Sequence, residues 1–245
     1  MKPTKKASEM SVKELAAYID HSVLKPDFTR DDVKKNIEEG MKFGCRTVCI
    51  NPSSLDIAIE LTKDSYTKVC VVCDFPFGNS TTESKVLQAE SYCKKGIFEL
   101  DIVANYGWIK SGLWTEVEAD LKAVNDVCHK YGVVTKVIFE TDALTVDEVK
   151  KVTEVAISAG SDFIKTSTGF YTGGPGVGAT PEIIQIMMDV AQGRCQIKGS
   201  GCIRTREHFL QLIDMGIDRM GIGFKSTPLV LGLDANGVEV SKESY

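Results

Sequence analysis

Eight short segments rich in apolar and β-branched residues recur along the chain at intervals near 30 residues, and the stretches between them have helical periodicity. Several of these segments are apolar almost throughout, which is typical of strands that other layers cover on both faces. We therefore predict eight strands, at residues 18–22, 47–50, 68–75, 98–103, 133–140, 162–166, 196–199 and 219–223.

Signals for helix starts and stops separate the predicted strands. Thr145 and Glu148 fit a capping box, and Pro181 after Thr180 suits a first helical turn. Six glycines fall where helices are expected to end, namely Gly40, Gly44, Gly96, Gly132, Gly160 and Gly216. This alternation predicts an α/β fold: a single (β/α)8 TIM barrel over residues 1–233, followed by a polar, mobile tail at 234–245. A doubly wound open sheet is the alternative.

Charge and hydropathy exclude several function classes. The chain has 29 basic and 34 acidic residues, giving a net charge of −5, so it has no basic excess with which to bind nucleic acid. No apolar run approaches the roughly 20 residues of a membrane span. The first residues lack the apolar segment of a secretory signal, which predicts a cytoplasmic protein.

The eight cysteines are expected to be reduced and mostly buried. Cys70 and Cys73 have the spacing of a redox dithiol, but they lie within a predicted strand, where residues three apart point to opposite faces. No second cysteine pair and no clustered histidines accompany them, so no metal site is predicted.

Ionisable residues stand at the predicted strand ends, where a barrel of this kind builds its active site. Lys165 ends the sixth strand and Lys198 the seventh. At about 5 Å, two ammonium groups repel each other by roughly 3 kcal/mol at an effective dielectric constant near 20. One amine is then expected to be neutral near pH 7 and able to form a Schiff base with a carbonyl. The equally weighted alternative is that each lysine pairs with a carboxylate, Lys165 with Asp101 for instance.

Asp101 alternates with apolar residues and should point into the barrel, where it can relay protons or form an ion pair. Glu99 has the same strand parity, so both carboxylates remain candidates. Two segments suit an anion such as phosphate, at residues 199–205 and 220–225, because free amides follow strands seven and eight. The glycine-rich stretch 170–179 is expected to be a flexible active-site loop.

At these residues the sequence resembles deoxyribose-phosphate aldolase, a class I aldolase family with a (β/α)8 barrel. The matching stretches fall in order at residues 19–26, 48–52, 74–79, 99–103, 136–141, 159–169 and 197–205. The resemblance implies reversible cleavage of 2-deoxy-D-ribose 5-phosphate to acetaldehyde and glyceraldehyde 3-phosphate, in deoxyribonucleotide catabolism. It implies that no cofactor and no metal take part.

The resemblance also implies residue roles. Lys165 would be the Schiff-base nucleophile, Lys198 the neighbouring lysine that favours its neutral form, and Asp101 the proton relay. The implied substrate-binding residues are Asp20, Cys49, Lys136, Thr166, Gly169, Gly201, Cys202, Arg204, Gly221 and Gly223. A homodimer is what the family suggests for assembly.

Two departures from the family pattern affect the phosphate region. Cys202 replaces the second of two successive glycines, and residues 221–225 replace the usual small hydroxyl residues. A cysteine side chain can block close backbone approach or restrict the dihedral angles that glycine allows. Two alternatives are therefore carried forward: an aldolase for unphosphorylated aldehydes, and a sugar-phosphate-binding barrel without catalysis. The terminal Tyr245 is a further candidate, as a proton carrier that reaches the site when the tail folds over the barrel.

Overall fold

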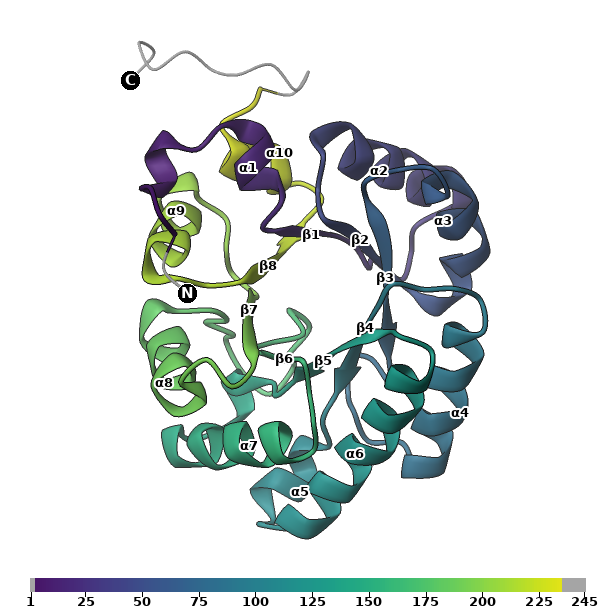
Figure 1. Cartoon of the computed structure of the whole chain (residues 1–245), viewed down its shortest axis with the longest axis vertical. Helices are drawn as coiled ribbons and strands as arrows, with labels where there is room; N and C mark the ends of the chain where they lie inside the picture. Colours follow the sequence, from purple (N-terminus) through teal and green to yellow (C-terminus); the bar gives the residue numbers. More distant parts are fainter. Residues whose placement is uncertain (1–2, 235–245) are drawn as a thin grey trace.

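Eight parallel strands close into a barrel in the computed structural model, which describes residues 3–234 (Figure 1). Each strand pairs with the next in sequence, and β8 returns to pair with β1. The strands are β1 (Ile19–Val23), β2 (Thr47–Ile50), β3 (Lys68–Cys73), β4 (Glu99–Val103), β5 (Val134–Ile138), β6 (Phe163–Lys165), β7 (Gln196–Ser200) and β8 (Arg219–Gly223). This closure confirms the predicted barrel and rejects the open doubly wound sheet.

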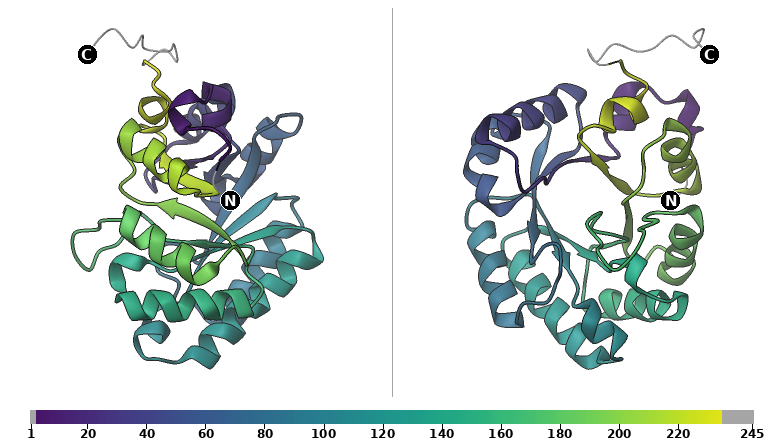
Figure 2. Two further views of the ribbon diagram at one scale, coloured as in Figure 1. Left: turned by 60° about the vertical axis from the view of Figure 1, so that its left-hand side comes forward. Right: turned by 180° about the vertical axis from the view of Figure 1, so that it is seen from behind.

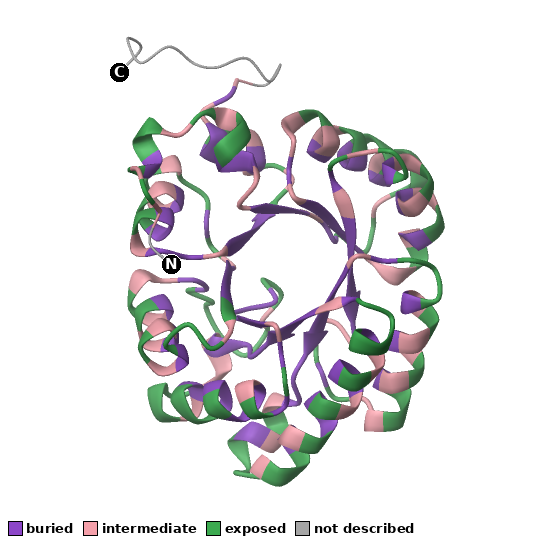
Figure 3. Ribbon diagram, viewed as in Figure 1, coloured by how far each residue is buried: buried purple, intermediate pink, exposed green. Residues whose placement is uncertain are grey.

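Helices surround the barrel and place their buried faces against it (Figure 2 and Figure 3). They are α1 (Val12–Ala16), α2 (Arg30–Phe43), α3 (Leu55–Thr62), α4 (Thr82–Cys93), α5 (Tyr106–Lys110), α6 (Trp114–Lys130), α7 (Val146–Ser158), α8 (Pro181–Ala191), α9 (Arg206–Met215) and α10 (Thr227–Leu231). Short 3₁₀ turns occur at Ala7–Glu9, Pro52–Ser54 and Thr141–Ala143. None of the helices within residues 3–234 is both long enough and apolar enough to cross a membrane.

The predicted strands are correct in number and order, and two of them match in both bounds. Two others were predicted too long at their carboxyl ends, because Asp74 and Glu140 have φ angles of 50° and 57°. An extended strand does not accommodate positive φ. The turns that these two residues make lead out of β3 and β5 into the loops at the mouth of the barrel.

The predicted helix signals hold with one exception. Thr145 and Glu148 form the capping box of α7, and Pro181 occupies the first turn of α8. Five of the six glycines have positive φ just beyond a helix, but Gly40 lies inside α2, so its prediction as a stop was wrong. A Cβ at Gly40 would lie 2.9 Å from His21 Cδ2 and 2.9 Å from Val48 Cγ1. This glycine is therefore required for the close packing of α2 on β1 and β2.

The apolar core lies mainly between the strands and the helices, while the inside of the barrel is more polar. Within the barrel, Leu24, Cys49, Cys70 and Val72 form a small apolar cluster with Phe75 beside it. Cys70 faces this interior and Cys73 faces α4, where its thiol lies 3.8 Å from the Lys85 carbonyl oxygen. All eight thiols are free and six are buried, as predicted.

Replacing Gly40 with alanine should destabilise the barrel. Gly→Ala in an open helix interior stabilises by roughly 1 kcal/mol, but here the added methyl group overlaps two buried side chains. We expect Gly40→Ala to lower the free energy of unfolding by about 1–3 kcal/mol in urea titrations. Gly174→Ala is the matched control, because a Cβ at that position has no atom within 4 Å among the described residues. A stabilised Gly40→Ala variant would contradict this account.

Candidate active site

A network of buried charges spans the interior of the barrel and draws on six strands. Its four cations are Lys136, Lys165, Lys198 and Arg219, and its three carboxylates are Asp20, Glu99 and Asp101. All of them are buried, with Arg219 the most exposed at 8%. The alternation of side chains along parallel strands directs these residues inward, between the apolar residues that face the helices.

Asp101 is the centre of this network. Its Oδ2 accepts hydrogen bonds from the Nζ atoms of Lys165 and Lys198, both at 2.7 Å. Its Oδ1 accepts from Lys136 Nζ at 3.0 Å and from the Cys70 thiol at 3.1 Å. The two lysines are thus neighbours, as predicted, and the alternative pairing of Lys165 with Asp101 holds as well, because one carboxylate oxygen serves both amines.

Glu99 and Asp101, which the sequence could not separate, lie in different parts of the network. Glu99 accepts from Lys136 at 2.5 Å and from Arg219 at 3.2 Å, and among the described residues no hydrogen bond or ion pair joins it to Lys165. Only Asp101 bridges Lys165 and Lys198 there. Of these two carboxylates, Asp101 is therefore the one that binds Lys165 at the end of β6.

Lys198 is held in its charged form. Burial by itself lowers the pKa of this amine, but attraction to Asp101 and Asp20 outweighs burial, and the pKa lies above its ordinary value. Lys198 Nζ lies 2.6 Å from Asp20 Oδ2 and 2.7 Å from Asp101 Oδ2. The expectation that repulsion would make one of the two amines neutral therefore cannot apply to Lys198.

Asp20 and Asp101 are held as carboxylates by the same cations. Burial raises the pKa of each, yet the attraction of Lys136 and the neighbouring lysines brings both below the usual range. Four cations face three carboxylates, so the network carries one excess positive charge when all groups are ionised. Lys165 is the member of the network that also borders the cavity.

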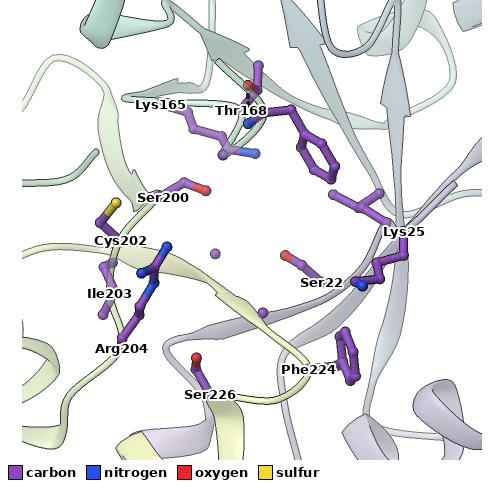
Figure 4. A pocket seen from close by; sticks show the side chains of 16 residues that line it. Ser22, Lys25, Lys165, Thr168, Ser200, Cys202, Ile203, Arg204, Phe224 and Ser226 are labelled. Atoms are coloured by element: carbon purple, nitrogen blue, oxygen red, sulfur yellow. Dashed lines mark hydrogen bonds between the residues drawn. The ribbon is translucent and has the colours of Figure 1, made fainter. Parts of the chain in front are cut away.

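A cavity of about 210 Å³ opens above this network at the carboxyl ends of the strands (Figure 4). It is smaller than a typical drug-sized ligand site and suits a small metabolite. Of the predicted site residues, seven line it: Lys165, Gly169, Gly201, Cys202, Arg204, Gly221 and Gly223. Asp20, Asp101, Lys136 and Lys198 lie beneath it in the charged network, and the Cys49 thiol lies 3.9 Å from Asp101 Oδ2.

Thr166 is not among the residues that line the cavity. Thr166 is fully buried; its hydroxyl donates to the Ser200 carbonyl and accepts from the Ser200 N–H, so it ties β6 to β7. Tyr245 lies outside the described residues, as does most of the predicted tail.

Cys202 adopts the conformation of the glycine that it replaces. Its φ is 58°, in the left-handed region that few residues other than glycine enter, and its thiol donates to the Gly176 carbonyl at 3.4 Å. The neighbouring Gly201 has φ 85°, and a Cβ there would lie 3.1 Å from Gly178 Cα. The departure at Cys202 thus leaves the backbone path intact, and the thiol contacts the loop that follows β6.

Two carboxylates outside the network position that loop. Glu140 accepts the hydroxyl and the N–H of Thr168, and burial raises the pKa of Glu140. Asp142 accepts the N–H groups of Val177 and Gly178. Thr168 lines the cavity, and Phe170 beside it packs edge-on against Phe75 with ring centroids 5.4 Å apart.

The cavity has nine lining residues that are not among the predicted site residues: Ser22, Leu24, Lys25, Thr168, Phe170, Ser200, Ile203, Phe224 and Ser226. Most are uncharged, and a search for ionisable residues at strand ends passes over them. Ser22, Ser200 and Lys25 lie in or just beyond the strands β1 and β7. A search of strand ends for hydroxyl groups would have found Ser22 and Ser200, and a search for ionisable residues extended two residues into each loop would have found Lys25.

Cys49, Cys70 and Asp101 bring three metal-ligating atoms within 4.8 Å of one another. Three lysine amines contact this Asp101, and Lys136 also contacts the Cys70 sulfur at 3.4 Å. Burial raises the pKa of the Cys70 thiol well above its ordinary value, which disfavours the thiolate that a metal requires. These neighbours make the group a poor site for a cation.

Comparison with known proteins identifies the family. The model of the DeoC/LacD family aldolases matches residues 15–235. The chain belongs to this family.

Individual relatives agree with this membership. The chain is 42% identical over 214 residues to a deoxyribose-phosphate aldolase of Caldanaerobacter subterraneus subsp. tengcongensis, covering 87% of this chain and 91% of the relative. It is 39% identical over 221 residues to a deoxyribose-phosphate aldolase of Staphylococcus saprophyticus, covering 90% and 97%. Among solved structures, a tetrameric deoxyribose phosphate aldolase from Aeropyrum pernix aligns with a TM-score of 0.80 and 28% identity, covering 90% of this chain and 91% of that one.

Replacing Asp101 with asparagine should affect stability and catalysis together. The amide has no charge to balance Lys165 and Lys198, and removal of one partner from a buried ion pair costs about 3–5 kcal/mol. We expect a lower urea midpoint and a loss of aldol cleavage of at least about a hundredfold, the range for loss of a proton-transfer group. Asp126→Asn, which removes an exposed partner of Lys122, is the control and should leave both unchanged. A stable and fully active Asp101→Asn variant would remove Asp101 from the mechanism.

Proposed function

We propose that this protein is a class I aldolase that reversibly cleaves 2-deoxy-D-ribose 5-phosphate to acetaldehyde and D-glyceraldehyde 3-phosphate. The observation that carries the proposal is the position of Lys165: its amine borders the cavity, and 2.7 Å away it shares one Asp101 oxygen with Lys198. A lysine amine that is buried, balanced by a carboxylate and open to a cavity has what Schiff-base formation requires.

The reaction begins when the neutral Lys165 amine attacks C1 of the open-chain sugar. The carbinolamine takes up a proton, loses water and becomes an iminium ion. The C3 hydroxyl then gives up its proton, the C2–C3 bond breaks, and its electron pair moves into the iminium to form an enamine. Glyceraldehyde 3-phosphate leaves, C2 of the enamine takes up a proton, and water releases acetaldehyde and restores the amine. The iminium accepts the electron pair in these steps, so the sequence balances without a redox partner or a Lewis acid.

Asp101 and Lys198 serve this sequence in different ways. When Lys165 forms the Schiff base it loses N–H hydrogens, so Asp101 Oδ2 becomes available to accept and return protons. Lys198 remains charged because Asp20 and Asp101 both bind it, and its ammonium opposes a second positive charge on Lys165. These roles, and the substrate contacts of the cavity residues, stand as part of the proposal.

Two alternatives from the sequence lose support. The sugar-phosphate-binding barrel without catalysis is disfavoured. Burying charged groups costs desolvation free energy, and binding alone gives no reason for the network of buried charges around Lys165. The aldolase for unphosphorylated aldehydes rested on Cys202, whose thiol contacts the neighbouring loop. The expected homodimer, the cytoplasmic location and the role in deoxyribonucleotide catabolism stay predictions.

The Schiff base can be trapped directly. Borohydride added during turnover of 2-deoxyribose 5-phosphate should leave a covalent adduct, which peptide mass spectrometry should locate on Lys165. Lys165→Met should give no adduct and no turnover. Lys110→Met, at an exposed surface lysine, should behave like the unmodified protein. An adduct confined to another lysine would overturn the assignment of the nucleophile.

The substrate preference tests the remaining alternative. Lys25, Lys165 and Arg204 line the cavity, and its described lining contains no carboxylate. Hydrogen bonds to charged groups contribute about 1.5–3 kcal/mol each, so kcat/KM for 2-deoxyribose 5-phosphate should exceed that for 2-deoxyribose by at least about a hundredfold. Equal values for the two sugars would favour the aldolase for unphosphorylated aldehydes.

A further inference from the structure

Two of the three cations that line the cavity have no partner of their own. Lys165 is bound by Asp101, but within residues 3–234 the side chains of Lys25 and Arg204 make no hydrogen bond and no ion pair. The chain as a whole is acidic, with a net charge of −5. Unpaired cations that border a cavity without a lining carboxylate make a site that attracts anions.

Lys25 and Arg204 approach the cavity from different loops. Arg204 follows β7, and Lys25 follows β1. Closure of the barrel places β1 against β8, with Ser22 paired in register with Gly223 and the Phe224 N–H donating to the Ser22 carbonyl at 3.2 Å. Figure 4 accordingly shows Lys25 beside Ser22 and Phe224, across the cavity from Arg204. The loop after β7 carries Arg204, and barrels often hold phosphate at the loops after strands seven and eight.

We propose that Lys25 is a specificity-determining residue that binds the phosphate group of the substrate from the β1 side of the cavity, opposite Arg204. This inference rests on the proposed function and adds to it a residue from outside the segments in which phosphate contacts were predicted. A phosphate monoester carries about 1.5–2 negative charges at pH 7, so Arg204 alone does not balance it. Lys25 supplies the second positive charge, and the Ser22 hydroxyl lies on the same side of the cavity (Figure 4).

Lys225 provides a matched comparison. It lies next to Phe224, with its Nζ 5.8 Å from that ring, but it is exposed and does not line the cavity. Removing its charge changes the net charge and the long-range field as much as removing that of Lys25. A difference between the two variants therefore reports direct contact with the substrate, beyond general attraction of anions.

The experiment compares Lys25→Ala, Lys25→Arg and Lys225→Ala on 2-deoxyribose 5-phosphate and on 2-deoxyribose. Lys25→Ala should raise KM for the phosphorylated sugar by about tenfold, as expected for loss of one charge-assisted hydrogen bond at a partly exposed site. Its kcat, and its kcat/KM for 2-deoxyribose, should change by less than about twofold. Lys25→Arg should restore most of the affinity, and Lys225→Ala should match the unmodified protein. An equal loss on both sugars, or an equal effect of Lys25→Ala and Lys225→Ala, would overturn the proposal.

A second measurement separates this inference from the proposed function. Inorganic phosphate should bind the unmodified protein and raise its melting temperature, and Lys25→Ala should weaken that binding several-fold while Lys225→Ala does not. If the unmodified protein cleaves neither sugar, the aldolase function fails, yet weakened phosphate binding by Lys25→Ala still supports Lys25 as an anion contact. If phosphate binds Lys25→Ala as tightly as the unmodified protein, the role of Lys25 is rejected whatever the turnover.

Discussion

The rest of the site depends on one carboxylate, Asp101, and on the two lysine amines that share its Oδ2. Charges inside a barrel cost solvation energy that only close partners recover. Asp101 is fully buried and has three lysines around it, while Asp20 and Glu99 bind the fourth cation, Arg219. Because these partners come from strands β1, β4, β5, β6, β7 and β8, the network forms only when the barrel is closed.

The contacts of Lys165 and Lys198 in this network differ, although the two side chains are chemically identical. Among the described residues, Lys198 has two carboxylate partners and is not a lining residue of the cavity, whereas Lys165 has one carboxylate partner and borders the cavity. The number of carboxylate partners and the position relative to the cavity therefore distinguish the proposed nucleophile, Lys165, from Lys198. Simple repulsion between the two amines would have made them equivalent, and the structure shows that Asp20 breaks this equivalence.

Charged groups also follow an order along the cavity, from its floor to its mouth. Its floor is the network of buried charges around Asp101, and its upper wall carries Lys25 and Arg204, whose side chains have no ion-pair partner within residues 3–234. Glycines keep the space between them open: a Cβ at Gly221 would lie 2.7 Å from the Ser200 hydroxyl oxygen. A substrate with an aldehyde at one end and a phosphate at the other matches this order of groups.

The sequence by itself determined the eight-strand barrel, the inward charges on its strands and the family, because periodicity, strand ends and motifs are local properties of the chain. It did not separate Glu99 from Asp101, it took Gly40 for a helix stop, and it passed over Lys25. Each of these depends on contacts between segments distant in sequence: the partners of each carboxylate, the approach of α2 to His21 and Val48, and the pairing of β1 with β8. Only the tertiary structure decides such questions, since the distance between two side chains, and hence their interaction energy, is set when the barrel closes.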